Sequence, residues 1–210
     1  MTHLASAVSN THTYLGNSEI NFFSDDENGL SVTIDTDRLH MRSVEATESE
    51  YDHYAALFGD KDVMEKYAIG QTKTRNEIKT RINDIWVKRW REKDPYTGLA
   101  VFKKDTDDFV GHVALGHGDH PGQAELAGLG NRSFWEHGYG SEAASAIVKE
   151  YAPAIIQEGY FLKGKPLQTI VGTARPDNPA SSRILEKIGF HFVCEEERHG
   201  ALRRRYEIDL

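Results

Sequence analysis

The most informative stretch of this sequence is Phe134-Trp135-Glu136-His137-Gly138-Tyr139-Gly140-Ser141-Glu142-Ala143. Its two glycines precede apolar residues at helical spacing, namely Ala143, Ile147, Tyr151 and Ile155. The first amides of a helix have no partner inside the helix, and the helix dipole is positive there. Glycines also let the backbone come close to an anion. The stretch therefore predicts an anion-binding turn that leads into a helix over about residues 141–157.

Two common nucleotide-binding loops do not fit this turn. No Lys follows its glycines, as a Walker A loop requires, and it lacks the third glycine of a dinucleotide-binding loop. Taken alone, Gly138-x-Gly140 is equally typical of a purely structural tight turn. The turn therefore needs support from the rest of the chain.

The periodicity of the apolar residues predicts one domain in which strands and helices are mixed. A half-buried strand is expected where Leu39 and Met41 alternate with polar residues, and helices where apolar residues recur every three or four positions. Gly189 is the glycine expected just after a helix end. The expected strands are 38–42, 96–103, 109–116, 123–129, 167–173, 190–195 and 202–210, and the expected helices are 46–58, 74–91, 141–157 and 181–188.

The N-terminal residues differ in charge from the rest of the chain. Residues 1–37 hold six acids and no Lys or Arg, whereas residues 38–210 hold 27 acids against 25 bases. Most of the net charge of −8 therefore lies at this end. We expect an acidic extension over residues 1–31, outside a domain of residues 32–210. Leu15, Ile20, Phe22 and Phe23 leave two interpretations open, a solvated tail and an arm that packs on its own domain or on a partner subunit.

Composition excludes several classes of function. The acidic balance of this chain of 210 residues argues against a general nucleic-acid binder. No apolar run approaches the roughly 20 residues of a membrane span, and residues 1–30 do not resemble a secretory signal. Cys194 is the single cysteine, which favours a reducing compartment such as the cytoplasm. None of the ten histidines has a zinc-binding spacing, so no metal is expected.

Three stretches, in order along the chain, resemble one family. The glycine turn is similar to the acetyl-CoA loop of GNAT-fold N-acetyltransferases, in the branch that includes the ribosomal-protein N-terminal (Rim-type) enzymes. Trp135 stands where the wider fold has Gln or Arg, as in that branch. The segments Asn178–Phe190 and Thr36–Arg42 resemble two further motifs of the branch, and the resemblance covers about Thr36 to Leu210.

The resemblance implies a fold and a reaction. The fold is a mixed α/β (α+β) one, with a central, mostly antiparallel sheet flanked by helices and splayed between its fourth and fifth strands, here 123–129 and 167–173. The reaction is transfer of an acetyl group from acetyl-CoA, the cosubstrate, to a primary amine by direct attack. The acceptor is a protein N-terminus or a small-molecule amine. A non-catalytic acyl-CoA-binding regulatory module is the alternative, and both a monomer and a homodimer fit the sequence.

The resemblance also assigns cofactor-binding residues. The backbone amides from His137 to Ser141 are expected to hold the pyrophosphate, and the Ser141 hydroxyl either adds a hydrogen bond or caps the helix. Asn178 is expected to bind the cofactor arm, although a turn-forming Asn between two prolines is the alternative. The expected cofactor-binding residues are Leu129, Gly130, His137, Gly138, Tyr139, Gly140, Ser141 and Asn178.

Acetyl transfer to an amine needs a base for the ammonium proton and an acid for the leaving thiolate. We favour Glu125 as the base, because it stands on the strand that faces the acceptor in this family; His112, whose ordinary pKa is near 6.5, competes with it. Ser181 matches the position proposed in this branch as the proton donor to sulfur, with capping of the short helix as an alternative. For Tyr206 and the run Arg203–Arg205 we expect an edge strand with solvated charges, and a reach into the cleft is the alternative.

Overall fold

The computed structural model describes residues 8–13, 18–198 and 200–210, and it is built around one large sheet. Ten strands pair in the order β1-β2-β3-β4-β5-β6-β7-β10-β12-β11. Neighbours are antiparallel throughout except β7 and β10, which run parallel. The strands are β1 (Val8–Thr13), β2 (Glu19–Asp25), β3 (Gly29–Asp35), β4 (Leu39–Ser43), β5 (Gly98–Lys103), β6 (Phe109–His117), β7 (Gln123–Gly130), β10 (Thr169–Ala174), β11 (His191–Arg198) and β12 (Ala201–Asp209), while β8 (Phe161–Leu162) and β9 (Lys165–Pro166) form a separate pair.

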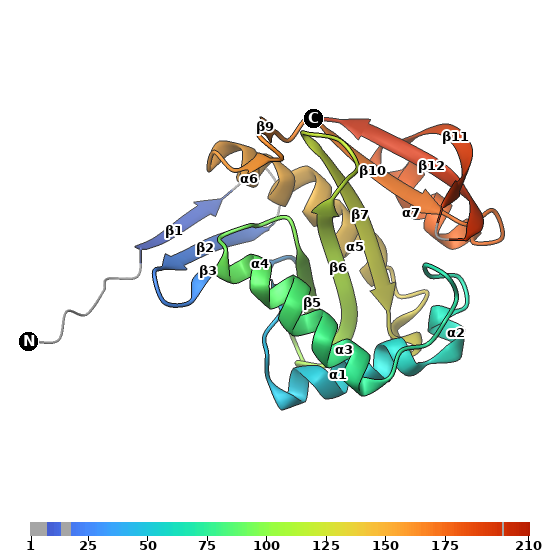
Figure 1. Ribbon diagram of the computed structural model, residues 1–210, viewed down its shortest axis with the longest axis horizontal. Coiled ribbons are helices and arrows are strands. Elements are labelled where there is room, and N and C mark those ends of the chain that lie inside the picture. Colours follow the sequence, from blue (N-terminus) through green and yellow to red (C-terminus); the bar gives the residue numbers. More distant parts are fainter. Residues whose placement is uncertain (1–7, 14–17, 199) are drawn as a thin grey trace, which may run out of the picture.

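Helices cover both faces of the sheet (Figure 1). On one face, Ile78 and Trp86 pack with Leu129 of β7, and on the other, Ala143 and Ile147 pack with Leu126. The side chains of β7 thus alternate between two cores, as a strand in a covered sheet requires. The first layer holds α1 (Glu48–Gly59), α2 (Lys61–Met64), α3 (Arg75–Arg81), η1 (Ile82–Val87) and α4 (Lys88–Arg91), and the second holds α5 (Tyr139–Ala146), η3 (Ile147–Tyr151), α6 (Ala152–Gln157) and α7 (Pro179–Ile188).

The two long predicted helices are both present, each with a π-helical segment in its middle. Residues 75–91 run through α3, η1 and α4, and residues 139–157 run through α5, η3 and α6. Thr74 and Glu77 form a reciprocal capping box that fixes the start of α3. The mixed α/β architecture with a large, mostly antiparallel sheet is confirmed.

The parallel pair β7–β10 opens part of the way along. Cα partners run from Thr169 with Gln123 to Gly172 with Leu126, where the pairing ends. Beyond it, residues 127–130 of β7 and 173–174 of β10 have no partner in each other. Because strand edges carry backbone donors and acceptors, this opening offers unpaired groups to an extended ligand. The splay expected between these two strands is therefore present.

Part of the acidic N-terminal stretch belongs to the sheet. β2 pairs with β3, and β3 pairs with β4, so the expected boundary between residues 31 and 32 falls inside β3. Ile20 and Phe22 are buried in the same core as α5. Of the two interpretations of the extension, packing on its own domain fits residues 18–31. Leu15 lies outside the described residues, and the division into two units remains a prediction.

Candidate active site

The glycine turn forms the start of α5, as the sequence predicts. Gly138 is the N-cap with φ of +81°, a left-handed conformation that favours glycine, and no side chain caps this helix end. Glu136 also has a positive φ, +66°, so the chain turns sharply just before the helix. The residues from Trp135 to Gly138 and Gly140 are exposed. The first amides of α5 are therefore open to an anion from solvent.

Ser141 is not the cap of this helix. It is the third helical residue, because α5 begins at Tyr139 and Gly138 occupies the N-cap position. The capping alternative for Ser141 is wrong, and its half-buried hydroxyl remains a candidate hydrogen-bond donor to a ligand at the turn.

The carboxylate of Glu142 ties the turn to the first strand of the matched region. Its Oε1 accepts hydrogen bonds from the Thr36 hydroxyl at 2.6 Å and the Arg38 backbone N–H at 3.0 Å, and its Oε2 accepts from Arg38 Nε at 2.6 Å. Arg38 Nη1 also donates to the His137 carbonyl at 2.9 Å. Burial raises the pKa of Glu142, but the hydrogen bonds from Thr36 and Arg38 outweigh it and leave the pKa below its ordinary value. Two of the recognised motifs thus form one clamp that holds the turn.

We expect Glu142→Gln to weaken the binding of acetyl-CoA, the cosubstrate that the sequence resemblance implies, more than it slows turnover. The amide cannot accept all three hydrogen bonds of the clamp, and a hydrogen bond to a charged group contributes about 1.5–3 kcal/mol. The KM for acetyl-CoA should therefore rise about tenfold or more, with a smaller change in kcat. Steady-state kinetics at saturating acceptor measures this. Glu136→Gln, an exposed residue of the same turn, is the control, and an equal effect in both variants would contradict the clamp.

Gly130 and Leu129, at the end of β7, differ in what they offer a ligand. Trp135 Nε1 donates to the Gly130 carbonyl at 2.8 Å, so that oxygen already has a partner. The side chain of Leu129 is buried among the residues of α1 and α3. Both residues nonetheless lie in the part of β7 that has no partner in β10. The tryptophan that marks this branch of the family therefore connects the glycine turn to the strand edge.

Asn178 and Ser181 come together at the start of α7. Asn178 is the N-cap, and its Oδ1 accepts the backbone N–H of Ser181 at 3.3 Å. Asn178 therefore has a structural role, as the N-cap of α7, where the sequence suggested a turn-forming residue between two prolines. Among the described residues its side-chain NH₂ donates to no partner, so it stays open to a ligand. Ser181 is half-buried, and its side chain does not cap α7, because Asn178 occupies the N-cap position. The capping alternative for Ser181 is therefore wrong.

Glu125 lies on the same face of β7 as Leu129 and is joined to an arginine. Arg198 Nη2 donates to Glu125 Oε2 at 2.8 Å, and Arg198 Nη1 donates to Asp119 at 2.7 Å. The carboxylate is about one-fifth exposed. Among the described residues, Oε1 of Glu125 accepts no hydrogen bond and is free to take a proton. Sequence analysis did not anticipate Arg198, because a β-hairpin brings it to Glu125 from 73 residues away.

His112 is enclosed rather than presented to a substrate. It is 4% exposed, its Nδ1 lies 2.9 Å from the Tyr54 hydroxyl, and its ring packs 4.4 Å from Trp86. Burial, and to a lesser extent the charge of Arg81, lower the pKa of His112 to about 3. A ring that is enclosed by Trp86 and faces the Tyr54 hydroxyl is poorly placed to reach an incoming amine. The geometry thus favours Glu125 over His112.

We expect burial of His112 to make the protein acid-sensitive. Its pKa in the folded chain, about 3, lies below the ordinary value of 6.5, so the unfolded state binds the proton more readily between these values. The free energy of unfolding should therefore be unaffected by His112 above pH 6.5 and should fall as the pH drops from 6.5 toward 3. Urea unfolding at several pH values should show a shallower fall for His112→Gln than for wild type. The exposed His191→Gln is the control, and parallel curves for wild type and His112→Gln would contradict the inference.

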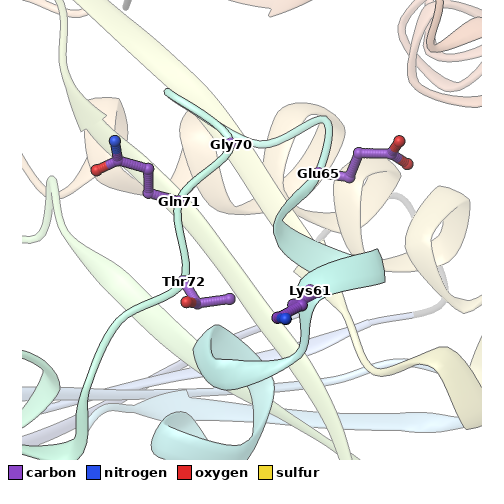
Figure 2. Close-up of a pocket in the computed structure, with 5 residues that line it drawn as sticks. All are labelled: Lys61, Glu65, Gly70, Gln71 and Thr72. Atoms are coloured by element: carbon purple, nitrogen blue, oxygen red, sulfur yellow. The ribbon is translucent and has the colours of Figure 1, made fainter.

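A shallow hollow lies on the segment around α2, which also contacts the residues before α7 through a hydrogen bond from Lys66 Nζ to the Asp177 carbonyl at 2.8 Å. It is lined by Lys61, Glu65, Gly70, Gln71 and Thr72. Figure 2 shows that the side chains of Glu65 and Gln71 point away from one another rather than toward a common point. This hollow contains none of the expected site residues and has no convergent set of polar groups.

The fold and this arrangement agree with the comparison to known families. Residues 38–191, well over half of the chain, match the acetyltransferase (GNAT) domain family. The chain belongs to this family and is an acetyltransferase.

Particular relatives carry the comparison further. The chain is 29% identical over 161 residues to YnaD, an uncharacterised N-acetyltransferase of Bacillus subtilis. The matched region covers 74% of this chain and 81% of YnaD. A GNAT-family acetyltransferase structure from Bacillus anthracis superposes with a TM-score of 0.68 at 23% identity, covering 84% of this chain and 98% of that one. The RimL ribosomal L7/L12 alpha-N-protein acetyltransferase in complex with coenzyme A gives 0.65 at 16% identity, covering 83% and 96%. The structural neighbours thus include Rim-type enzymes.

Two further observations concern the described part of the chain. No helix there is long and apolar enough to cross a membrane. No group of three or more His, Cys, Asp or Glu residues within it is arranged to hold a metal ion.

Proposed function

We propose that this protein transfers an acetyl group from acetyl-CoA to a primary amine by direct attack. One observation carries the proposal: the opening between β7 and β10 lies beside the exposed N-terminus of α5, with the carboxylate of Glu125 on β7. An anion site, an unpaired strand edge and a base then serve one reaction.

The residues of the opening fit the cosubstrate. The amides from His137 to Ser141 would hold the pyrophosphate, as a helix N-terminus with glycines favours. The edge of residues 127–130 that faces β10 would pair with the pantetheine arm, and the free NH₂ group of Asn178 would donate to it. When bound, acetyl-CoA supplies an acetyl group activated as a thioester.

The chain's own residues manage the protons. Glu125 Oε1 takes the proton of the incoming ammonium group, which makes the amine nucleophilic. The Ser181 hydroxyl, at the start of α7, donates a hydrogen bond to the departing sulfur. A serine is a weak acid in water, so its role is to position a hydrogen bond or a relaying water rather than to protonate sulfur in bulk.

The acceptor is a protein N-terminus or a small-molecule amine. The first is supported by the structural likeness to RimL, a ribosomal L7/L12 alpha-N-protein acetyltransferase, and the second by the variety of acceptors that one fold serves. A cytoplasmic location and a monomeric or homodimeric state remain predictions from the sequence.

Thiol release tests the proposal against the non-catalytic alternative. The protein is incubated with acetyl-CoA and a panel of amines and peptide N-termini, and free CoA is followed. We expect turnover that disappears in Gly138→Trp, which places a bulky side chain over the turn, and falls in Asn178→Ala. Binding of acetyl-CoA without turnover across a broad panel would favour a regulatory acyl-CoA-binding module.

A further inference from the structure

Arg203, on β12, is a buried cation without a carboxylate of its own. It is 5% exposed, yet its guanidinium donates only to backbone carbonyls, from Nη2 to Ala68 at 2.7 Å and from Nε to Arg198 at 3.3 Å. No carboxylate oxygen of the described residues lies within 4.0 Å of it. Buried charges in proteins are usually paired, because leaving water is costly for an isolated ion. The expectation of solvated charges on an edge strand is wrong for Arg203, since β12 lies inside the sheet between β10 and β11.

The acids near Arg203 have other partners. Glu196 stands directly across from it on β11, but the Glu196 carboxylate lies 3.6 Å from Arg205. Glu125 is paired with Arg198. Asp177 is paired with Arg175, whose own positive charge acts on Arg203.

The charges around Arg203 agree with its lack of a carboxylate partner. Burial is the largest cause that lowers the pKa of Arg203, and the charges of Arg175 and Arg198 lower it further, whereas Glu125 and Tyr67 act in the opposite direction. Like charges disfavour one another, and an anion brought among these arginines would relieve the repulsion. Among the described residues, Arg203 is therefore the arginine of this group that lacks a carboxylate partner.

Arg203 lies on the same face of the sheet as Glu125. Glu125 is level with Val171 in the register of β7 and β10, and Thr173 is level with Arg205 of β12. Side chains two residues apart on a strand share a face, so Glu125, Arg205 and Arg203 all project to the same side. The carbonyl of Ala68, in the segment after α2, holds the Arg203 guanidinium from above this face.

We propose that the acceptor carries an anionic group, a carboxylate or a phosphate, close to its amine, and that Arg203 binds this group while Glu125 receives the amine. The proposal rests on the proposed function and narrows its substrate class. It disfavours polyamines, whose further positive charges would meet Arg198 and Arg203. A charge-assisted hydrogen bond also orients the acceptor, because the planar guanidinium binds a carboxylate or phosphate in a fixed geometry.

Matched acceptors test the proposal on the wild-type protein. Each pair differs only in the anionic group: an α-amino acid against its carboxamide, a peptide with Glu at its second position against Gln, and phosphoethanolamine against ethanolamine. A hydrogen-bonded ion pair discriminates by about 10- to 100-fold, so kcat/KM should favour the anionic member of at least one pair by that factor. The pair that responds most strongly identifies the source of the anion, and spermidine should be a poor acceptor.

Variants of β12 assign the selectivity to Arg203. In Arg203→Gln the preference for the anionic member should fall toward unity through KM for the acceptor, with KM for acetyl-CoA unchanged, and Arg203→Lys should keep part of it. Arg204→Gln is the matched control, because Arg204 is the next residue and pairs with Glu195 at the surface. Thermal unfolding would reveal whether Arg203→Gln folds. If it does not, the matched acceptors assayed with the wild-type protein still test the anionic acceptor.

The outcomes separate the two levels of the proposal. Turnover that is equal within every pair, or highest with spermidine, would overturn the anionic acceptor and leave the acetyltransferase function standing. A change in KM for acetyl-CoA rather than for the acceptor in Arg203→Gln would place the anion on the cosubstrate and also overturn it. No turnover with any amine would count against the proposed function, and the acceptor proposal would fall with it.

Discussion

Glu125→Gln is expected to slow acetyl transfer by about 100- to 10 000-fold at neutral pH, the usual contribution of a general base. The carboxylate stands on β7 beside the opening to β10 and keeps Oε1 free, while Arg198 holds Oε2 at 2.8 Å. Glutamine has the same shape but cannot take the ammonium proton. The variant should regain rate as the pH rises toward the pKa of the acceptor, because a larger fraction of the amine then arrives neutral. Initial rates of CoA release from pH 6 to pH 10 measure both effects.

Asp119→Asn is the matched control for this experiment. Asp119 is the other carboxylate bound to Arg198, and its pKa is lowered chiefly by that hydrogen bond. Its loss disturbs the same arginine without removing Glu125, so its effect on the rate should be small. Unchanged rates for Glu125→Gln at every pH would remove Glu125 as the base.

Gly29→Ala is expected to give the largest loss of stability. Gly29 begins β3 with φ of +82°, and a Cβ there would lie 2.4 Å from the Trp90 carbonyl oxygen and 2.5 Å from the Arg91 Cα, both on α4. Backbone atoms of a helix cannot move aside as a flexible side chain can. Left-handed strain and the overlap together should lower the free energy of unfolding by about 2–4 kcal/mol. Urea unfolding measures the loss.

Gly164→Ala is the matched control for Gly29→Ala. Gly164 has nearly the same φ, +81°, but a Cβ at that position would have nothing within 4 Å. Its substitution isolates the conformational strain, which should cost about 1 kcal/mol. Equal losses in the two variants would mean that the hairpin of β2 and β3 does not pack against α4 as described.

The N-terminal strands show why charge alone misleads about structure. Five of the six acids that indicated an extension lie in the β2–β3 hairpin, where Asp25 accepts the backbone N–H groups of Glu27 and Asn28. Acids in a turn do not prevent the flanking strands from burying one face. Ile20 and Phe22, two residues apart, are the buried side chains of that face. An alternating pattern of so few residues is easily missed beside a charged turn.

The candidate site also has parts that the sequence predicts and parts that it does not. The turn at Gly138, the start of α7 and the splay of β7 from β10 follow from local patterns and motifs, and they are present. The contacts that complete the site join residues far apart in the sequence: Arg38 with Glu142 across 104 residues, and Arg198 with Glu125 across 73. Their side chains are ordinary surface types whose partners only the sheet order specifies. The burial of Arg203 likewise depends on β11, which covers the edge of β12.

Amide hydrogen exchange with and without acetyl-CoA tests most directly where the cosubstrate binds. The account predicts slower exchange in three stretches: the end of β7 (127–130), the turn and first helical residues (136–142), and the start of α7 with the residues before it (173–182). Gly138→Trp should abolish these changes. Binding that slows exchange elsewhere, for example only along residues 61–72 around the hollow of Figure 2, or no change in any stretch at saturating acetyl-CoA, would contradict the proposed site.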